Sequence, residues 1–340
     1  MKQENGGKRV ALFSHDESTN KRGEVSKKKW MFPGKEPLYQ KGRMQSIMQS
    51  WFILQHPSGP FFQLTEQEFE KACLTYPELN SSDPMYYERE ASAQIALNGE
   101  NYFDNETVLE QFERLFQLVQ FSEALKDLSI EILVDNATTH TSKKFSINDF
   151  RKGEGYDCPL DEIEWLDENN NLQTLNCYYE NEEGEFVSKG LLKIAKELKL
   201  VRENQTVKLD DLKEICKKHA AFKETTKLEE VAAKYPNIKI IFVPKFHYEL
   251  NPIEGVWAFS KNRNRRYNDL SSFNNYIDLL NETKQIIKEY VLCKKLWRRF
   301  WNVVKAYKKG YDFIFVLTEY FSLKSQSKKQ EHRRITNTNI

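Results

Sequence analysis

Three short apolar segments, far apart in the chain, constrain its fold more than any other feature. They are residues 9–14 (RVALFS), 130–134 (IEILV) and 238–243 (IKIIFV). Each run has the length of a strand and ends abruptly at polar residues or at proline, which is typical of buried strands. Further strands are expected over residues 46–54 (SIMQSWFIL) and around residues 30–32. These segments predict a sheet assembled from distant parts of the chain.

Helical patterns lie between and after these strands. Residues 104–126 carry apolar side chains at helical spacing, with Asp104 or Asn105 as the expected N-cap. Residues 61–100 show weak periodicity and several turn signals, and are interpreted as an insertion. From residue 252 onward the pattern predicts helices over 252–266, 270–290 and 291–310.

Residues 150–235 are interpreted as a second and larger insertion. Its first half is acidic and rich in asparagine, and its second half holds three short amphipathic helix candidates, over 189–201, 210–222 and 225–234. The order of elements predicts an α/β sandwich with a mixed sheet, in which this mostly helical insertion separates the fourth strand from the fifth. The basic segment 321–340 is expected to be a disordered tail.

Composition excludes several classes of protein. A length of 340 residues suggests about two domains, or one domain with large insertions. Aromatic residues reach 13%, which excludes a largely disordered chain. No apolar run approaches the roughly 18 residues of a membrane span, and the first ten residues lack the apolar core of a secretory signal. The five cysteines form no CxxC pair, so a reducing compartment is expected, without a disulfide framework or a zinc finger.

Charge is distributed unevenly along the chain. Residues 255–340 contain 18 lysines and arginines against seven acidic residues, a balance of +11. The first 254 residues contain 33 basic and 43 acidic residues, a balance of −10. This asymmetry is compatible with a polyanionic partner for the C-terminal part, or with solvated helix faces followed by a basic tail.

Three carboxylates stand at the borders of the predicted core elements. Asp16 follows the first strand, Asp135 ends the strand at 130–134, and Glu254 opens the helix after the last strand. Converging carboxylates repel one another and raise one another's pKa unless a cation lies between them. Hard oxygen ligands of this kind suit Mg²⁺ or Mn²⁺, and two such ions can promote phosphoryl transfer.

Longer motifs surround these carboxylates. The run PKFHYELNPIE ends at Glu254 and is followed by Trp257 and Lys261, DN begins at Asp135, and HDES surrounds Asp16. In their order along the chain, these motifs resemble the catalytic domain of DDE transposases of the mariner-like superfamily, whose most specific signature is LNPIE-x-x-W. KGR at 41–43 and KGLL at 189–192 resemble further family features.

The resemblance implies an RNase H-like fold, with residues 9–149 and 236–320 forming the catalytic domain around the 150–235 insertion. It implies that Asp16, Asp135 and Glu254 hold two Mg²⁺ or Mn²⁺ ions and catalyse DNA strand cleavage and strand transfer. The implied partners are transposon ends and target DNA, and the implied location is the nucleus, without secretion or a membrane. A homodimer on paired ends is expected by analogy.

Two departures from the family pattern bear on these expectations. The second aspartate and the glutamate are 119 residues apart, where ordinary members have a few tens, and the 150–235 insertion accounts for the difference. Members also carry an N-terminal helix-turn-helix region. Only eight residues precede Arg9 here, so that region is expected to be missing.

Several residues near the motifs are expected to support the triad rather than to bind metal. They are Asn136, His140, His247 and Asn251. The extra acids Glu17 and Glu249 are interpreted as solvated or as similar supporting residues. Asn251, Pro252 and Glu254 also fit a helix-capping pattern, which we accept as an additional structural role. Cys216 and His219 lie one helical turn apart, but no second pair accompanies them to build a zinc site.

Basic residues after Glu254 are the candidates for DNA contact. Phosphate binding is expected from Lys261, Arg263, Arg265, Arg266, Arg298 and Arg299. Trp297, Phe300 and Trp301 flank the last two arginines and, with Val304, are interpreted as the buried face of an amphipathic helix. Two other functions stay open at this point. One is a truncated or domesticated DNA-binding protein of transposon origin without catalysis; the other is a different RNase H-like nuclease, against which LNPIE-x-x-W argues.

Overall fold

The computed structural model describes residues 9–24, 45–80, 85–97, 102–167, 171–267, 272–289 and 291–321. The strand expected around residues 30–32, the motif at 41–43 and, apart from Phe321, the expected tail lie outside them. The chain divides into two compact units, one made of Met1–His140 with Val231–Ile340 and the other of Thr141–Glu230. The expected boundaries were 150 and 235.

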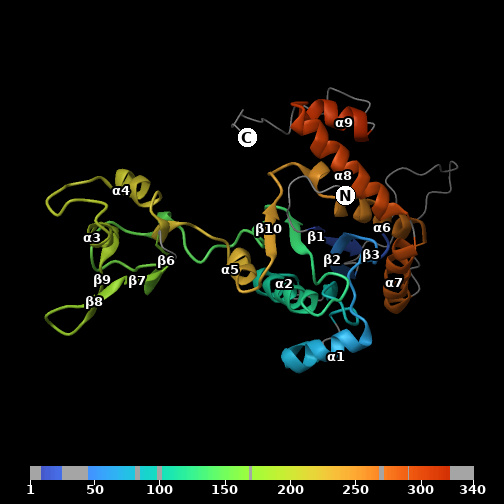
Figure 1. Cartoon of the computed structure of the whole chain (residues 1–340), viewed down its shortest axis with the longest axis horizontal. Helices are drawn as coiled ribbons and strands as arrows, with labels where there is room; N and C mark the ends of the chain where they lie inside the picture. Colours follow the sequence, from blue (N-terminus) through green and yellow to red (C-terminus); the bar gives the residue numbers. More distant parts are fainter. Residues whose placement is uncertain are drawn as a thin grey trace, which may run out of the picture. The chain divides into compact units, whose positions relative to one another are not determined.

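A mixed six-stranded sheet forms the core of the larger unit within the described ranges (Figure 1). Its strands are β1 Val10–Lys21, β2 Ser46–His56, β3 Gly59–Phe61, β4 Ala93–Leu97, β5 Ser129–Val134 and β10 Ile238–Phe242. The order is β10-β5-β1-β2-β3, and β4 also pairs with β2. β1 is antiparallel to β2 but parallel to β5, which is in turn parallel to β10. The predicted α/β class with a mixed sheet is confirmed.

The first strand is twice as long as the sequence suggested. It does not end before the polar residues HDEST but continues to Lys21, because every residue from Leu12 onward pairs with β2. Along this extension His15, Ser18 and Asn20 are buried, and polar side chains of β2 bond to His15 and Asn20. Asn20, for example, donates from Nδ2 to Gln49 Oε1 at 3.0 Å. Satisfied polar groups can be buried in a sheet at little net cost, so polarity alone mislocated the end of the strand.

The segment 61–100, expected to be an insertion, also contributes to the sheet. It contains helix α1 Glu66–Thr75, the short 3-10 helix η1 Pro77–Asn80 and strand β4. Strand β4 pairs antiparallel with the first half of β2, from Ser46↔Leu97 to Ser50↔Ala93. The segment 61–100 therefore contributes a strand to the core sheet.

Helices cover both faces of the sheet. On one face lies α2 Asn105–Val119, capped by Asp104 as predicted, with Phe112 packed on Phe52 of β2 at a ring distance of 5.1 Å. It ends at Val119 rather than near residue 126. On the other face lie α6 Ile253–Tyr267, α7 Phe273–Glu289 and α8 Leu292–Lys308, which share one apolar core with β1 and β2. A further helix, α9 Phe313–Phe321, was not predicted.

The aromatic residues of the LWRRFW motif behave as the amphipathic interpretation expected. Trp297 and Phe300 are buried in the core shared by α6, α8 and the sheet. Trp301 is half-buried and donates from its indole Nε1 to Gln55 Oε1 at 3.0 Å. These rings hold α8 on the sheet and are not available for stacking on nucleic-acid bases.

The smaller unit has its own apolar core, which includes Phe150, Ile163 and Leu191. Its acidic first half forms two β-hairpins that the sequence did not predict, β6 Glu162–Leu166 with β7 Leu172–Asn176 and β8 Tyr178–Glu180 with β9 Phe186–Ser188. The three predicted helices are present but shorter, as α3 Gly190–Glu197, α4 Leu209–Cys216 and α5 Lys227–Ala233. The insertion is thus a mixed α/β unit.

The two ends of the smaller unit meet. Lys143 and Thr226 form an antiparallel bridge, and Lys227 N donates to Ser142 O at 2.8 Å. Across all described residues, no helix has both the length and the apolar character needed to cross a bilayer.

Candidate functional site

Asp16 lies within β1 rather than after it. Successive side chains of a strand point to opposite faces of the sheet. Leu12 packs in the core beneath α6 and α8, and Ser14 is bonded to Asn251 just before α6, so Asp16 belongs to this face. Its pairing partner Trp51 contacts Trp257 of α6 at a ring distance of 4.7 Å. The first predicted acid therefore faces the helix that carries the third.

Asp135 immediately follows β5, beside the middle of β1. The parallel register pairs Ser14 with Leu133, so the chain leaves β5 next to His15 and Asp16. Asp135 Oδ1 accepts hydrogen bonds from Ala137 N at 2.9 Å and from the Nδ1 of His140 at 2.6 Å. These bonds fold residues 135–140 into a tight loop. Asn136 donates from Nδ2 to Val243 O and so ties this loop to the end of β10.

Glu254 is brought to the same place by the anchored start of α6. Ser14 donates to Asn251 Oδ1 at 2.5 Å, and Ile253 N donates to Ser14 Oγ at 3.4 Å. Ser14 and Asn251 are both buried. Gly255 allows α6 to approach α8 closely, since a Cβ there would lie 2.3 Å from Leu296 Cδ2. The LNPIEG run thus fixes where the glutamate stands relative to β1.

Burial and neighbouring groups shift the pKa of each of the three acids. Burial, then the negative charges of Glu254, Glu17 and Asp135, raise the pKa of Asp16 well above its usual range. Glu254 is exposed as a residue, but partial desolvation of its carboxylate and the charge of Asp135 raise its pKa, against the opposing effect of Lys261. Burial would also raise the pKa of Asp135, but the hydrogen bonds from His140 and Ala137 outweigh it, and the net pKa is lowered.

A second cluster lies on the other face of β1. His15 and Glu17 alternate with Asp16 and face α2, where the His15 ring packs against Phe112 at 4.6 Å. His140 comes up beside them, with Nε2 3.3 Å from Glu17 Oε1. Among the described residues, only His15, Glu17 and His140 offer three potential metal-ligand atoms that all lie within 4.8 Å of one another. The predicted metal triad forms a looser group.

His247 does not support the triad. Its Nδ1 lies 2.5 Å from Glu249 Oε1, which also accepts a hydrogen bond from Tyr307 OH at 2.7 Å. The His247 ring packs against Tyr307 of α8 and Phe313 of α9. Glu249 is 3% exposed, so the interpretation of a solvated acid is wrong. This polar cluster joins the loop before α6 to the last two helices, which explains its place in the sequence motif.

The predicted DNA-binding residues fall into two groups. Arg263 pairs with Glu282 at 2.8 Å and Arg265 with Glu24 at 2.7 Å, so glutamates already neutralise part of their charge. Lys261 lies close enough to Glu254 to lower the pKa of that acid. Arg299 is half-buried, stacks on Phe321 at 4.2 Å, and its burial lowers its pKa. Of the six, Arg266 and Arg298 are the exposed ones.

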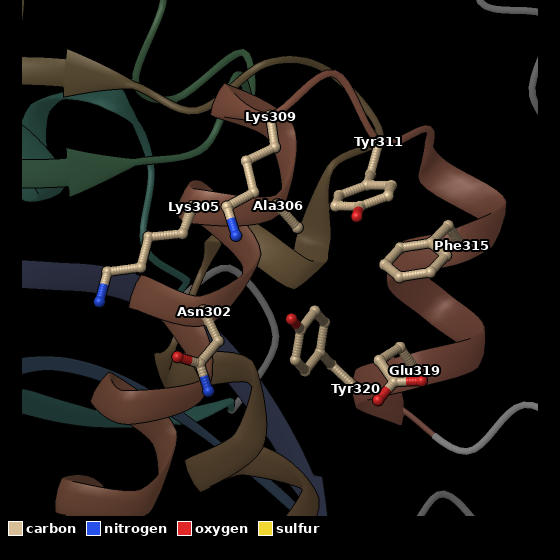
Figure 2. A pocket seen from close by; sticks show the side chains of 8 residues that line it. All are labelled: Asn302, Lys305, Ala306, Lys309, Tyr311, Phe315, Glu319 and Tyr320. Carbon is tan, nitrogen blue, oxygen red and sulfur yellow. The ribbon is translucent and has the colours of Figure 1, made fainter.

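A groove of about 320 Å³ lies elsewhere, between α8 and α9 (Figure 2). Tyr311 and Phe315 stack along one side with ring centroids 4.2 Å apart, and Lys305 and Lys309 stand opposite them. None of the acids described above lines it. The groove is therefore separate from the carboxylate site.

The carboxylate site fits a divalent cation on the chemistry of its donors. The three acids come from three separate segments, and burial, followed by the charges of Glu254, Glu17 and Asp135, raises the pKa of Asp16. Oxygen donors of this kind suit Mg²⁺ or Mn²⁺.

Comparison with protein-family models, with curated proteins and with solved structures gives no match for this chain.

Proposed function

We propose that the larger unit is the catalytic domain of a DNA-cleaving and strand-transferring enzyme, a DDE transposase of the mariner-like kind. The observation that carries the proposal is the placement of Asp16, Asp135 and Glu254 in the middle of β1, at the end of β5 and at the start of α6, on segments joined by the β1–β5 pairing and by the Ser14–Asn251 bond. Parallel strands commonly present catalytic groups near their carboxyl ends, where a rigid sheet holds the loops.

The sheet supports an RNase H-like fold as part of this proposal. Its first two strands are antiparallel, while β5 and β10 add to β1 in parallel on the other side. Helix α2 immediately precedes β5, and helices follow β10. The smaller unit then corresponds to an insertion in the connection from β5 to β10.

The chain's own residues would act by position and charge. Asp16 and Asp135 would hold Mg²⁺ or Mn²⁺ ions, with Asp16 shared between two, and Glu254 would complete the second set of ligands. When bound, such ions would activate a water or a 3′-hydroxyl as the nucleophile and would stabilise the leaving oxygen of the phosphate. His140 keeps Asp135 oriented through the 2.6 Å bond, and the Ser14–Asn251 contact keeps Glu254 against β1.

The metal part of the proposal is tested by thermal unfolding with Mn²⁺, in protein first stripped with a chelator. At about 100 times the Kd, binding to the folded state should stabilise the wild type by about 2.7 kcal/mol. Glu254→Gln removes one charge from an exposed side chain and should lose most of this shift. An unshifted wild type would contradict the metal site and favour the non-catalytic DNA-binding alternative.

DNA is the proposed partner, and the nucleus the proposed location. Changing Arg266 and Arg298 together to alanine should reduce the slope of log K against log salt by about two, because each phosphate contact contributes about 0.9. The pairs of Arg263 and Arg265 with glutamates should make their replacement less damaging. Lys71→Ala, on α1, is a control for an exposed cation. An unchanged slope in the double variant would remove this face from the DNA interface.

A further inference from the structure

We propose that His15, Glu17 and His140 form a binding site for one zinc ion, on the face of β1 opposite the carboxylate triad. The three candidate ligand atoms are His15 Nδ1, Glu17 Oε1 and His140 Nε2. All three are buried; His15 Nδ1 has no hydrogen-bond partner among the described residues, while Glu17 Oε1 and His140 Nε2 face each other at 3.3 Å. His15 is 0% and His140 1% exposed, and the side chain of Glu17 is 10% exposed.

Hydrogen bonding fixes the His15 ring so that its lone pair points into this cluster. Gln111 donates from Nε2 to two backbone carbonyls, which leaves its Oε1 as an acceptor. Ser50 Oγ donates its single hydrogen to Gln111 Oε1 at 2.7 Å. The 2.8 Å contact between Ser50 Oγ and His15 Nε2 must then be donated by His15. A neutral imidazole protonated on Nε2 carries its lone pair on Nδ1.

His140 has the arrangement typical of a metal-bound histidine. Its Nδ1 bonds to the carboxylate of Asp135 at 2.6 Å, and its Nε2 points away from that bond towards Glu17. Metal-binding histidines usually donate their second nitrogen to a carboxylate or a carbonyl, which fixes the ring and raises its basicity. Ser50 and Gln111 provide the equivalent support for His15.

Two imidazoles and one carboxylate suit zinc, whose bonds to such ligands are about 2.0–2.2 Å. Around a tetrahedral ion the ligand atoms are about 3.4 Å apart, so the 3.3 Å between His140 and Glu17 already fits. One candidate ligand atom of each residue lies within 4.8 Å of the other two, so the His15 ring would have to move by an ångström or so to complete the site, roughly the difference from a tetrahedral spacing. Burial of both rings favours a redox-inert structural ion, with water as the fourth ligand, over an open iron site.

Such an ion would join β1 to the loop that follows β5. His15 and Glu17 come from β1, whereas His140 closes the loop that begins at Asp135. Asp135 is hydrogen-bonded to His140 of this cluster, and its charge also acts on Asp16 of the triad. The zinc site therefore has a positioning role for Asp135 and is distinct from the Mg²⁺ or Mn²⁺ site proposed above.

The experiment is zinc uptake by the full chain. Chelator-stripped protein is incubated with zinc sulfate, desalted and analysed for metal, and Co²⁺ replaces zinc to give a visible spectrum that reports nitrogen ligands. The wild type should retain one zinc per chain. Glu17→Gln, which preserves shape, and His15→Phe, which preserves ring packing, should each weaken binding at least about tenfold.

Three controls separate the outcomes. Thermal unfolding of the stripped variants shows whether each still folds, and His247→Gln tests a histidine outside the cluster. Glu254→Gln should keep its zinc while losing the Mn²⁺ response, so failure of one site is distinguishable from failure of the other. The proposal is overturned if the wild type retains no zinc, which is the result expected if His140 is a fixed imidazolium ion. It is also overturned if Glu17→Gln and His15→Phe fold and bind zinc like the wild type.

Discussion

Asp16→Asn should abolish metal-dependent DNA cleavage and at the same time make the metal-free protein more stable. Loss of a shared metal ligand removes several kcal/mol of transition-state stabilisation, which corresponds to a fall in rate on the order of a thousandfold. The gain in stability has a separate cause. Burial and the neighbouring acids raise the pKa of Asp16, so its ionised form is less favourable in the folded state than in the unfolded state, a cost that asparagine lacks.

The sign of the pH dependence follows from linkage. A carboxyl whose pKa is raised by folding binds its proton more tightly in the native state, so stability falls as pH rises from its ordinary pKa through its folded pKa. The wild type and Asp16→Asn should therefore unfold at similar temperatures near pH 3, and the variant at the higher temperature at pH 7. Asp127→Asn, an exposed acid on the loop before β5, is the matched control. A variant that still cleaves DNA at the wild-type rate would refute the role of Asp16.

Glu90→Gln should be the most destabilising conservative change in the larger unit. Glu90 and Lys284 of α7 form an ion pair in which both side chains are 2% exposed, and Lys288 adds a second contact at 3.2 Å. The Lys284 ammonium also lies 3.4 Å from the centre of the Tyr87 ring. Removing one partner of a buried pair leaves an unpaired charge, at a cost of about 3–5 kcal/mol. Glu123→Gln, which breaks an exposed pair with Lys126, should cost under about 1 kcal/mol.

This loss should depend on pH. Burial lowers the pKa of Lys284 to about 8, even with Glu90 beside it. Between about pH 8 and the ordinary lysine pKa of 10.5, the unfolded state binds more protons than the folded state, so stability rises with pH in that window. At alkaline pH Lys284 is neutral, so the variant no longer buries an unpaired charge. The loss of stability caused by Glu90→Gln should therefore be smaller there, as measured by urea unfolding. Glu90→Gln with Lys284→Met should recover most of the stability; if it does not, packing rather than charge is responsible.

Elements with strong local signals could be predicted from the sequence. The apolar runs of β5 and β10 and the amphipathic pattern of α2 are properties of a few adjacent residues. The end of β1 is different, because Ser18 and Asn20 are polar but buried against partners far away in the chain. The hairpins of the smaller unit were missed because their strands are only three to five residues long and bury few side chains, so that only pairing across each hairpin defines them as strands.

The same contrast applies to the site. Asp16, Asp135 and Glu254 could be found because each stands in a recognisable motif. The cluster of His15, Glu17 and His140 could not be found in this way, because it lies on the opposite face of β1 and His140 reaches it from a loop. The alternation of His15 and Glu17 about Asp16 was the available signal. It became meaningful only with the loop geometry that places His140 3.3 Å from Glu17.

The meeting of the two ends of the smaller unit changes the folding problem for the sheet. Pairing β10 with β5 would otherwise require closing a loop of about a hundred residues. Once the bridge between Lys143 and Thr226 has formed, the effective loop contains only about twenty residues, from 135–143 and 226–237. Closure entropy grows as (3/2)RT ln n, so this shortening is worth about 1.4 kcal/mol. The sheet thus gains a long-range contact at the entropic cost of a short one, and the unit can change in length without altering strand order.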